Sequence, residues 1–235
     1  MKIALVGYGK MGHIIDEIAT KKGHEIVARL NESPTLENLN DPDVVIEFSN
    51  PEVAFNNIKV CLENKIPVIC GTTGWLDHKS EIEKITLDNK TAFLYGSNFS
   101  LGVNLFFALN EKLANLMEGF SEYNVQLEEI HHTHKKDAPS GTAISLAQGI
   151  IKNDKRFDAW KLDETQNQEL GIFAIREDEV PGTHSVYYKS DVDEIEIKHT
   201  AFNRNGFAVG AVVAAEWIIG KTGNFSMNDV LFSKP

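Results

Sequence analysis

One short segment of the sequence, residues 128–142, concentrates side chains that can move protons and bind anions. It holds three histidines and two lysines within six residues of an otherwise acidic chain. Histidine is the side chain that most readily gives or takes a proton near neutral pH, so acid/base chemistry is predicted here. The residues concerned are His131, His132, His134, Lys135 and Lys136.

A helix is predicted to begin directly after this cluster, near Ser140. Apolar residues recur there at helical spacing, at Ile144, Leu146, Ala147, Ile150 and Ile151. The first N–H groups of a helix have no intrahelical partner and lie at the positive end of its dipole. Those of Ser140, Gly141 and Thr142 are therefore expected to point at an anion. A carboxylate fits that position, assisted by Lys135 and a histidine.

Other interpretations of the segment remain open. Ser140 also suits an N-cap, with Pro139 leading into the helix, and this is compatible with ligand binding. The histidines could instead hold a metal ion with Glu128 or Glu129. The chain lacks the H-E-x-x-H spacing, however, and two adjacent lysines would oppose a cation. We therefore expect no metal, and the density of histidines argues against unrelated surface residues.

A second motif lies at the start of the sequence, where Gly7-Tyr8-Gly9-Lys10-Met11-Gly12 fits the pattern G-x-G-x-x-G. It follows the apolar run Lys2 to Val6 and precedes a helical pattern that begins at Met11. Glycines there let the backbone turn tightly and approach a pyrophosphate, whose charge meets the free N–H groups of the helix start. Alone the pattern is also typical of a glycine-rich turn; between a strand and a helix it predicts dinucleotide binding.

The end of the second predicted strand leaves the choice of dinucleotide open. An acidic residue there would bind the ribose hydroxyls of NAD, whereas an Arg would favour the 2′-phosphate of NADP. The chain offers Arg29, Asn31 and Glu32. Asn31 can bind a hydroxyl without repelling a phosphate, and Glu32 suits either a ribose ligand or a solvated charge. The expected cofactor is NADPH, NADH or both.

Two further loops follow predicted strands where a dinucleotide would lie, because ligands of open α/β sheets bind beyond the carboxyl ends of the strands. Each alone could be an ordinary turn. They are Gly71-Thr72-Thr73-Gly74 and Gly96-Ser97-Asn98-Phe99.

The elements that must position these motifs form two blocks. Strands predicted at 2–6, 25–28, 44–46, 66–70 and 91–95 alternate with helices, which indicates a Rossmann-type parallel sheet covered on both faces. After Gly102 the pattern changes to a long helix, from about Val103 to Met117, and then to strands at 123–130, 171–176, 185–189 and 193–198. This second block predicts an α+β domain with an open, mainly antiparallel sheet. The helix predicted at 208–219 closes the chain.

Composition excludes several classes of function. The 235 residues carry 23 Lys and Arg against 34 Asp and Glu, a net charge of −11. This balance argues against a nucleic-acid partner and against an anionic membrane surface. Cys61 and Cys70 are too few for a disulfide framework and are predicted to be buried thiols. The first apolar run is too short for a signal peptide, and no stretch is long enough to span a membrane, so we expect a cytoplasmic protein.

With these residues in view, the chain resembles the 4-hydroxy-tetrahydrodipicolinate reductase (dihydrodipicolinate reductase) family over nearly its whole length. The specific part is the segment from His131-His132 to Ala143, which is similar to the family pattern E-x-H-H-x-x-K-x-D-A-P-S-G-T-A. Further similarity lies in the two loops after the fourth and fifth strands, and in Asn98-Phe99-Ser100 with Gly102, Val103 and Asn104.

The resemblance implies an NAD(P)H-dependent reduction of a small dicarboxylate ring in lysine and diaminopimelate biosynthesis. His131 would be the acid/base that protonates the ring, and Lys135 would donate a proton or bind the substrate's charge. Arg204 matches a family arginine near the cofactor. The substrate carboxylates would be held by His132, Lys135, Ser140, Gly141 and Thr142.

It also implies an organisation. Residues 1–101 and 204–235 would form a discontinuous dinucleotide-binding domain, and residues 102–203 a domain for substrate binding and oligomerisation. The family is typically tetrameric through the open sheet, so a homotetramer is expected.

Some features depart from the family pattern, and two other functions stay open. The glycine loop is one residue tighter than in many members, Lys10 stands where Arg is usual, and Asn31 where an acidic residue is common. Cofactor preference is therefore undecided. The alternatives are another Rossmann amino-acid dehydrogenase, of aspartate or homoserine type, and a non-catalytic NADPH-binding sensor. Neither would need the complete set of acid/base and anion-binding residues found here.

Overall fold

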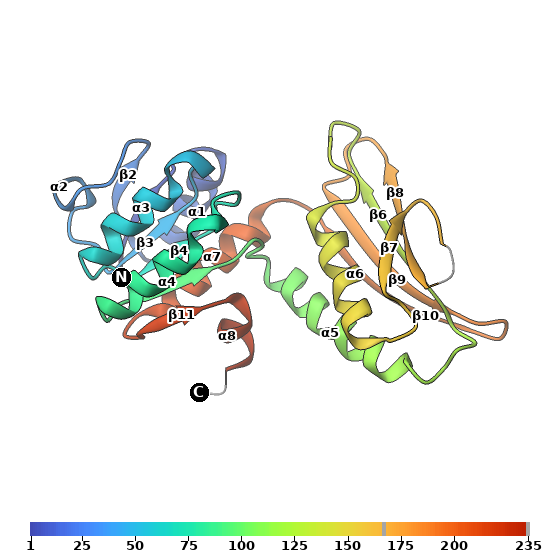
Figure 1. The fold of residues 1–235 in the computed structure, drawn as a ribbon. Helices are drawn as coiled ribbons and strands as arrows, with labels where there is room; N and C mark the ends of the chain where they lie inside the picture. The colour runs from blue at the N-terminus through green and yellow to red at the C-terminus, as the bar shows by residue number, and fades with distance from the viewer. Residues whose placement is uncertain (166–167, 234–235) are drawn as a thin grey trace. The chain divides into compact units, whose positions relative to one another are not determined.

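The computed structural model describes residues 1–165 and 168–233 and divides into two compact units. Met1–Leu101 and Asn205–Pro235 make up the first unit, and Gly102–Arg204 the second. The chain thus leaves the first unit once and returns to it for its last segment (Figure 1).

The first unit is built on a parallel sheet with the strand order β11-β5-β4-β3-β1-β2. Its strands are β1 Lys2–Val6, β2 Glu25–Leu30, β3 Val44–Glu47, β4 Val68–Cys70, β5 Ala92–Tyr95 and β11 Gly223–Phe225. Its helices are α1 Lys10–Lys21, α2 Leu36–Leu39, α3 Pro51–Glu63, α4 Lys79–Asp88, α7 Asn205–Ile218 and α8 Met227–Phe232, with a 3-10 turn η1 at Leu76–His78.

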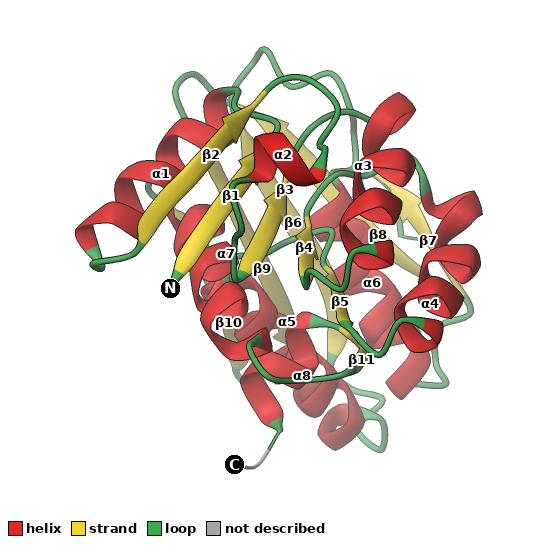
Figure 2. Cartoon of the chain, turned by 90° about the vertical axis from the view of Figure 1, so that its left-hand side faces the viewer, coloured by secondary structure: helices red, strands yellow, loops and turns green. Residues whose placement is uncertain are grey.

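Alternate residues of β1, β3, β4 and β5 enter two separate cores. Ile3 and Leu5 pack with α1 and α7 on one face, whereas Ala4 and Val6 pack with α3 and α4 on the other. Figure 2 shows these helix pairs on opposite sides of the sheet. Burial on both faces explains why the strands read as continuous apolar runs rather than as alternating patterns. The Rossmann-type prediction is confirmed.

The second unit packs α5 and α6 against one face of a five-stranded sheet (Figure 1). Val125, Leu127, Leu146 and Ile150 belong to the core between these layers. The strand order is β10-β9-β6-β8-β7. The elements are α5 Leu101–Met117, β6 Asn124–His131, α6 Gly141–Asn153, β7 Ala159–Leu162, β8 Glu169–Arg176, β9 Gly182–Lys189 and β10 Glu194–Ala201.

This sheet is mixed, which corrects the expectation of a mainly antiparallel one. β10 and β9, and β9 and β6, pair antiparallel, but β6 pairs parallel with β8, and β8 with β7. Half of the sheet is parallel because the chain crosses over to its edge, at strand β7, before it enters β8. The chain crosses from β6 over α6 to this short edge strand, and it was not predicted because its four residues are all half-buried and show no alternation.

Cys61 and Cys70 are free and buried, as predicted. Burial raises the pKa of the Cys61 thiol to about 12. In the part of the chain that the structure describes, no helix is long and apolar enough to cross a membrane.

Candidate active site

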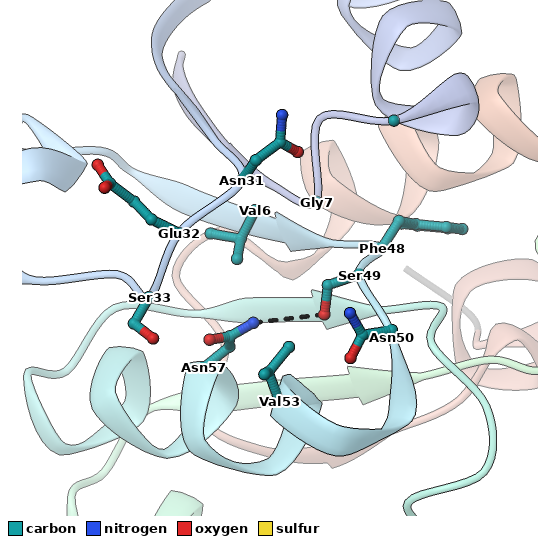
Figure 3. Close-up of a pocket in the computed structure, with 11 residues that line it drawn as sticks. Val6, Gly7, Asn31, Glu32, Ser33, Phe48, Ser49, Asn50, Val53 and Asn57 are labelled. Atoms are coloured by element: carbon teal, nitrogen blue, oxygen red, sulfur yellow. Dashed lines mark hydrogen bonds between the residues drawn. The ribbon is translucent and has the colours of Figure 1, made fainter.

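A cavity of about 360 Å³ opens in the first unit beyond the carboxyl ends of β1, β2 and β3 (Figure 3). Its walls come from the loops that follow these three strands and from the first turns of α3. β1 and β3 are neighbours, but the chain runs from β1 to β2 toward one edge of the sheet and from β3 to β4 toward the other. Dinucleotides bind at such a switch point in open α/β sheets.

The glycine loop fits this cavity because of its backbone. Gly7 and Gly9 line the cavity. Gly7 has φ +93°, and a Cβ there would lie 2.2 Å from the carbonyl oxygen of Phe48. A Cβ at Gly12 would lie 2.6 Å from the carbonyl oxygen of Gly7. Only glycine therefore allows β1, α1 and the loop after β3 to approach this closely. Gly9, the N-cap of α1, makes no side-chain capping bond, and the first turn has no acidic residue.

Arg29, at the end of β2, is already engaged in an ion pair. Its guanidinium donates to both carboxylate oxygens of Asp16, at 2.5 and 3.1 Å, and the Tyr8 hydroxyl donates to the same carboxylate at 2.6 Å. These bonds from Arg29 and Tyr8 lower the pKa of Asp16 despite its burial. The cavity is lined instead by Asn31, Glu32 and Ser33.

The loop after β3 also lines the cavity and was missed in the sequence. Ser49 and Asn50 face the cavity beside Asn57 of α3, whose amide donates to the Ser49 hydroxyl at 3.3 Å (Figure 3). The buried Glu47 carboxylate accepts from the Ser49 hydroxyl and from the Cys70 thiol, the latter at 3.3 Å. The rule applied to the fourth and fifth strands would have found this loop, because it follows the third strand in the same way.

The other residues predicted to bind the cofactor lie around these loops. A Cβ at Gly71 would overlap the Phe48 ring, which in turn packs at a tilt against Phe99, with 5.6 Å between the ring centroids. The Thr72 hydroxyl accepts from the Ser49 N–H at 2.9 Å. Within the first unit, Lys10, Thr73 and Ser97 are exposed, and Met11, Gly96 and Asn98 are half-buried.

Arg204 is exposed and is the last residue of the second unit, outside the residues that line the cavity.

The second unit gathers a compact polar cluster on the buried face of its sheet. Glu129 and His131 are two residues apart in β6 and therefore share that face. His184 of β9 stands directly opposite Glu129 in the antiparallel register. Glu129 is fully buried, and His131 and His184 are 8% and 5% exposed. Gly182 makes room for the His131 ring, because a Cβ there would lie 2.7 Å from its Cε1.

The two histidines meet through their Nε2 atoms, which are 3.3 Å apart. Both atoms lie 3.7 Å from Oε2 of Glu129. His184 Nε2 is also 3.0 Å from the Ser140 hydroxyl, which caps α6 by accepting from the Ala143 N–H. His131 Nδ1 lies 3.3 Å from the Pro181 carbonyl. A carbonyl oxygen only accepts, so Nδ1 of His131 is the protonated nitrogen of the neutral ring.

Glu129 accepts the Ser140 N–H at 2.9 Å and the Arg176 guanidinium at 3.0 Å. This corrects one expectation: the anion that the Ser140 N–H meets is the protein's own carboxylate, not a ligand. Burial alone would raise the pKa of Glu129, but the nearby His184 ring and hydrogen bonds from Ser140 and Arg176 lower it to about 2. Glu129 is therefore ionised across the neutral range.

His131 is neutral in the same range. Burial, followed by the positive charge that His184 and Lys135 can contribute, lowers the pKa of His131 to about 4, although Glu129 opposes that shift. An acid of this pKa gives up its proton readily but holds one at neutral pH only when a further negative charge is close.

The loop between β6 and α6 carries the remaining predicted residues. Lys135 donates to both carboxylate oxygens of Asp137, at 2.8 and 2.7 Å. Nδ1 of His132 is buried without a hydrogen-bond partner among the described residues. Gly141 is exposed and Thr142 half-buried in the first turn of α6.

Arg176 and His184 were missed in the sequence, and Glu129 was considered only as a metal ligand. The ligand atoms of Glu129, His131 and His184 do lie within 4.8 Å of one another, which is close enough for a metal ion. Arg176 and the Ser140 N–H, however, already satisfy the carboxylate of that trio. The expected absence of a metal stays a prediction.

A dinucleotide-type cavity in one unit and a buried acid/base cluster in the other are typical of two-domain, nicotinamide-dependent oxidoreductases. Residues 1–99 match the family model of the dihydrodipicolinate reductase N-terminus, and residues 102–231 that of its C-terminus. The chain belongs to the dihydrodipicolinate reductase family, whose members use NADH or NADPH.

Full-length relatives agree with this assignment. A 4-hydroxy-tetrahydrodipicolinate reductase of Christiangramia forsetii is 53% identical over 233 residues, covering 98% of both chains. The enzyme of the same name from Archaeoglobus fulgidus is 33% identical, covering 98% of this chain and all of that one (100%). The structure of a dipicolinate-bound dihydrodipicolinate reductase from Paenisporosarcina sp. TG-14 has the same fold, with a TM-score of 0.79 at 21% identity, covering 98% of this chain and 99% of that chain.

Proposed function

We propose that this chain catalyses the NAD(P)H-dependent reduction of 4-hydroxy-tetrahydrodipicolinate to tetrahydrodipicolinate, in diaminopimelate and lysine biosynthesis. The observation that carries the proposal is the cluster of Glu129, His131 and His184 beside the start of α6, in a chain 53% identical to a reductase of that name. The same cluster disfavours a sensor, which needs no acid/base, and the family models disfavour the aspartate or homoserine dehydrogenases.

The cofactor fits the first unit. The uncapped start of α1 and the Cβ-free approach at Gly7 suit a pyrophosphate. When bound, NAD(P)H supplies the hydride. The residues that would hold it are Gly7, Tyr8, Gly9, Lys10, Met11, Gly12, Asn31, Gly71, Thr72, Thr73, Gly96, Ser97, Asn98, Phe99 and Arg204, together with Ser49 and Asn50.

The end of β2 favours a cofactor with free ribose hydroxyls. Arg29, the residue that would suit a 2′-phosphate, is already paired with Asp16. Glu32 lines the cavity and would repel a phosphate, whereas Asn31 and Ser33 can hydrogen-bond hydroxyls. NADH is therefore expected to be used at least as well as NADPH.

The substrate's carboxylates would bind where the second unit offers unsatisfied donors. His132 Nδ1 is buried without a partner among the described residues, and α6 begins with the N–H groups of Gly141 and Thr142. Lys135 adds a positive charge, since it can exchange Asp137 for the ligand. Ser140 contributes through its hydroxyl, which already contacts His184.

His131 is the proposed proton donor to the ring. Its Nδ1–H is held by the Pro181 carbonyl, which directs Nε2 toward the cluster. The overall reaction adds a hydride and a proton and releases water, so one proton must be delivered in each turnover. The positive charge of Lys135 lies near enough to lower the pKa of His131. Lys135 is therefore the second candidate for the group that delivers the proton.

Two broader expectations belong to the same proposal. The exposed apolar side chains of β10 and the segment after it, Ile195 and Phe202, suit an interface between copies, so we expect a homotetramer formed through the open sheet. The buried free thiols and the use of NAD(P)H suit the cytoplasm.

The test is a coupled assay. Substrate is generated from pyruvate and aspartate semialdehyde by a synthase, and oxidation of NADH or NADPH is followed by absorbance. Synthase-dependent oxidation is expected with both cofactors. No oxidation by a protein shown to bind NADH, combined with NAD(P)⁺ reduction on aspartate or homoserine, would replace this proposal with the dehydrogenase alternative.

A further inference from the structure

His184 is a buried histidine whose Nε2 lies close to three polar side chains. That atom is 3.3 Å from Nε2 of His131, 3.0 Å from the Ser140 hydroxyl and 3.7 Å from Oε2 of Glu129. The two rings meet edge to face, with 5.0 Å between centroids. They come from different strands, β6 and β9, so the contact is fixed by the pairing of those strands.

The two rings of this contact can take up one further proton. The Pro181 carbonyl fixes the proton of neutral His131 on Nδ1, so its Nε2 is an acceptor that faces His184. If His184 carries its proton on Nε2, it donates to His131 or to Ser140. If not, two nitrogen lone pairs face each other at 3.3 Å. When both Nε2 atoms are bare, one added proton forms an N–H⁺···N bridge between them. When His184 already donates from Nε2, the added proton goes to its Nδ1 and the existing bridge becomes charged. In either case a second proton would be opposed by the first.

The charges around the pair decide when that proton is held. Glu129 favours it from 3.7 Å, but Arg176 already neutralises this carboxylate. Lys135 opposes it, although Asp137 is paired with that lysine. His199 of β10, directly opposite His184 in the register, lies in the same neighbourhood and is half-buried. Free of ligand, His131 is therefore neutral, and the negative charge of a bound dianion favours an added proton on the pair.

We propose that His131 and His184 act as one unit that takes up a single proton from solvent when a dicarboxylate binds, shares its charge through the Nε2···Nε2 hydrogen bond, and delivers one proton from Nε2 of His131 to the ring. This rests on the proposed function of the site. His184 is a positioning residue, because it acts through His131. After delivery the pair is neutral again, and the proton taken up on binding is the one that the reduction consumes.

The direct test counts protons. The full-length protein is titrated calorimetrically with dipicolinate at about pH 6, in buffers of different ionisation enthalpy. Proton uptake of about one per site is expected, and the affinity should tighten by up to about tenfold per pH unit as the pH falls from about 8. Uptake near zero throughout this range would overturn the proposal. Failure of dipicolinate to bind at all would contradict the substrate site as well.

Single substitutions test whether the proton is bound by both histidines together or by one of them alone. His131→Gln and His184→Gln should both abolish proton uptake while NADH binding is retained, and His184→Gln should lower kcat by about 10- to 100-fold. His134→Gln, on the exposed part of the same loop, is the matched control and should keep the uptake. Full uptake in His184→Gln would assign the proton to His131 alone and overturn the shared site. Ring-nitrogen NMR shifts of the wild type, with and without dipicolinate, give the same answer without a mutation.

Discussion

Replacing Glu129 by Gln isolates the charge of the buried carboxylate at the centre of the cluster. Gln keeps the shape of Glu and one acceptor oxygen, but it removes the negative charge that meets Arg176 and the two histidines. Because Gln resembles the protonated acid, the effect of E129Q follows from the proton affinity of Glu129 in the folded protein.

The size of that effect can be worked from the pKa. Hydrogen bonds hold the pKa of Glu129 at about 2, against an ordinary value of 4.5. Since each tenfold change in proton affinity is about 1.4 kcal/mol, E129Q should lower the free energy of unfolding by about 3 kcal/mol at neutral pH. A carboxyl group whose pKa is lower in the folded than in the unfolded chain stabilises the fold at pH values above the unfolded-state pKa. This stabilisation is lost as the pH falls through the folded-state pKa. The difference in free energy of unfolding between the wild type and E129Q should therefore shrink to about 1.5 kcal/mol near pH 3.

Urea unfolding of the full chain measures this difference. Trp160 lies in β7 of the second unit, so its fluorescence reports on that unit once Trp75 and Trp217 have been replaced by Phe. Glu128→Gln, the neighbouring residue on the opposite face of β6, is the matched control and should change little. A difference below about 1 kcal/mol for E129Q at neutral pH, or a gap that does not narrow on acidification, would refute the reasoning.

Four other outcomes are expected. His131→Gln should lower kcat by at least about 100-fold with NADH affinity unchanged; normal turnover would remove His131 from catalysis. Lys135→Met should weaken dipicolinate binding by about 10- to 100-fold, the size of a charge-assisted hydrogen bond, and an unchanged affinity by calorimetry would place the anion site elsewhere. Glu32→Ser should shift the ratio of kcat/KM toward NADPH by about tenfold, and no shift would exclude Glu32 from the ribose site. Gly7→Ala should abolish NADH binding, because its Cβ would collide with the Phe48 backbone; retained binding would show that the loop can move.

The parallel sheet was predictable from the sequence because its strands are buried on both faces. Such strands leave continuous apolar runs, and the glycine motif marks the first turn between a strand and a helix. The predicted boundaries agree with the structure to within a few residues. The short strand β11 was not predicted, since three half-buried residues carry no periodicity of their own.

The cavity was predictable only in part. Two of its walls, the loops after β1 and β2, were expected from the sequence, and the wall after β3 follows from the same rule. The ion pair between Arg29 and Asp16 could not be predicted, because it depends on which face of the edge strand β2 meets α1. That contact bears on cofactor preference, so the sequence alone left the choice open.

The acid/base cluster shows why local patterns were not sufficient. Glu129 and His131 share a face by the two-residue period of a strand, and this much is visible in the sequence. His184 joins them only because β6 and β9 pair with Glu129 opposite His184. A slip of one residue would place Thr183 or Ser185 there instead and turn His184 to the other face of the sheet. The proton site thus depends on the strand register. Any substitution that shifts the pairing of β6 and β9 should abolish the proton uptake, even though every residue of the site is unchanged in the sequence.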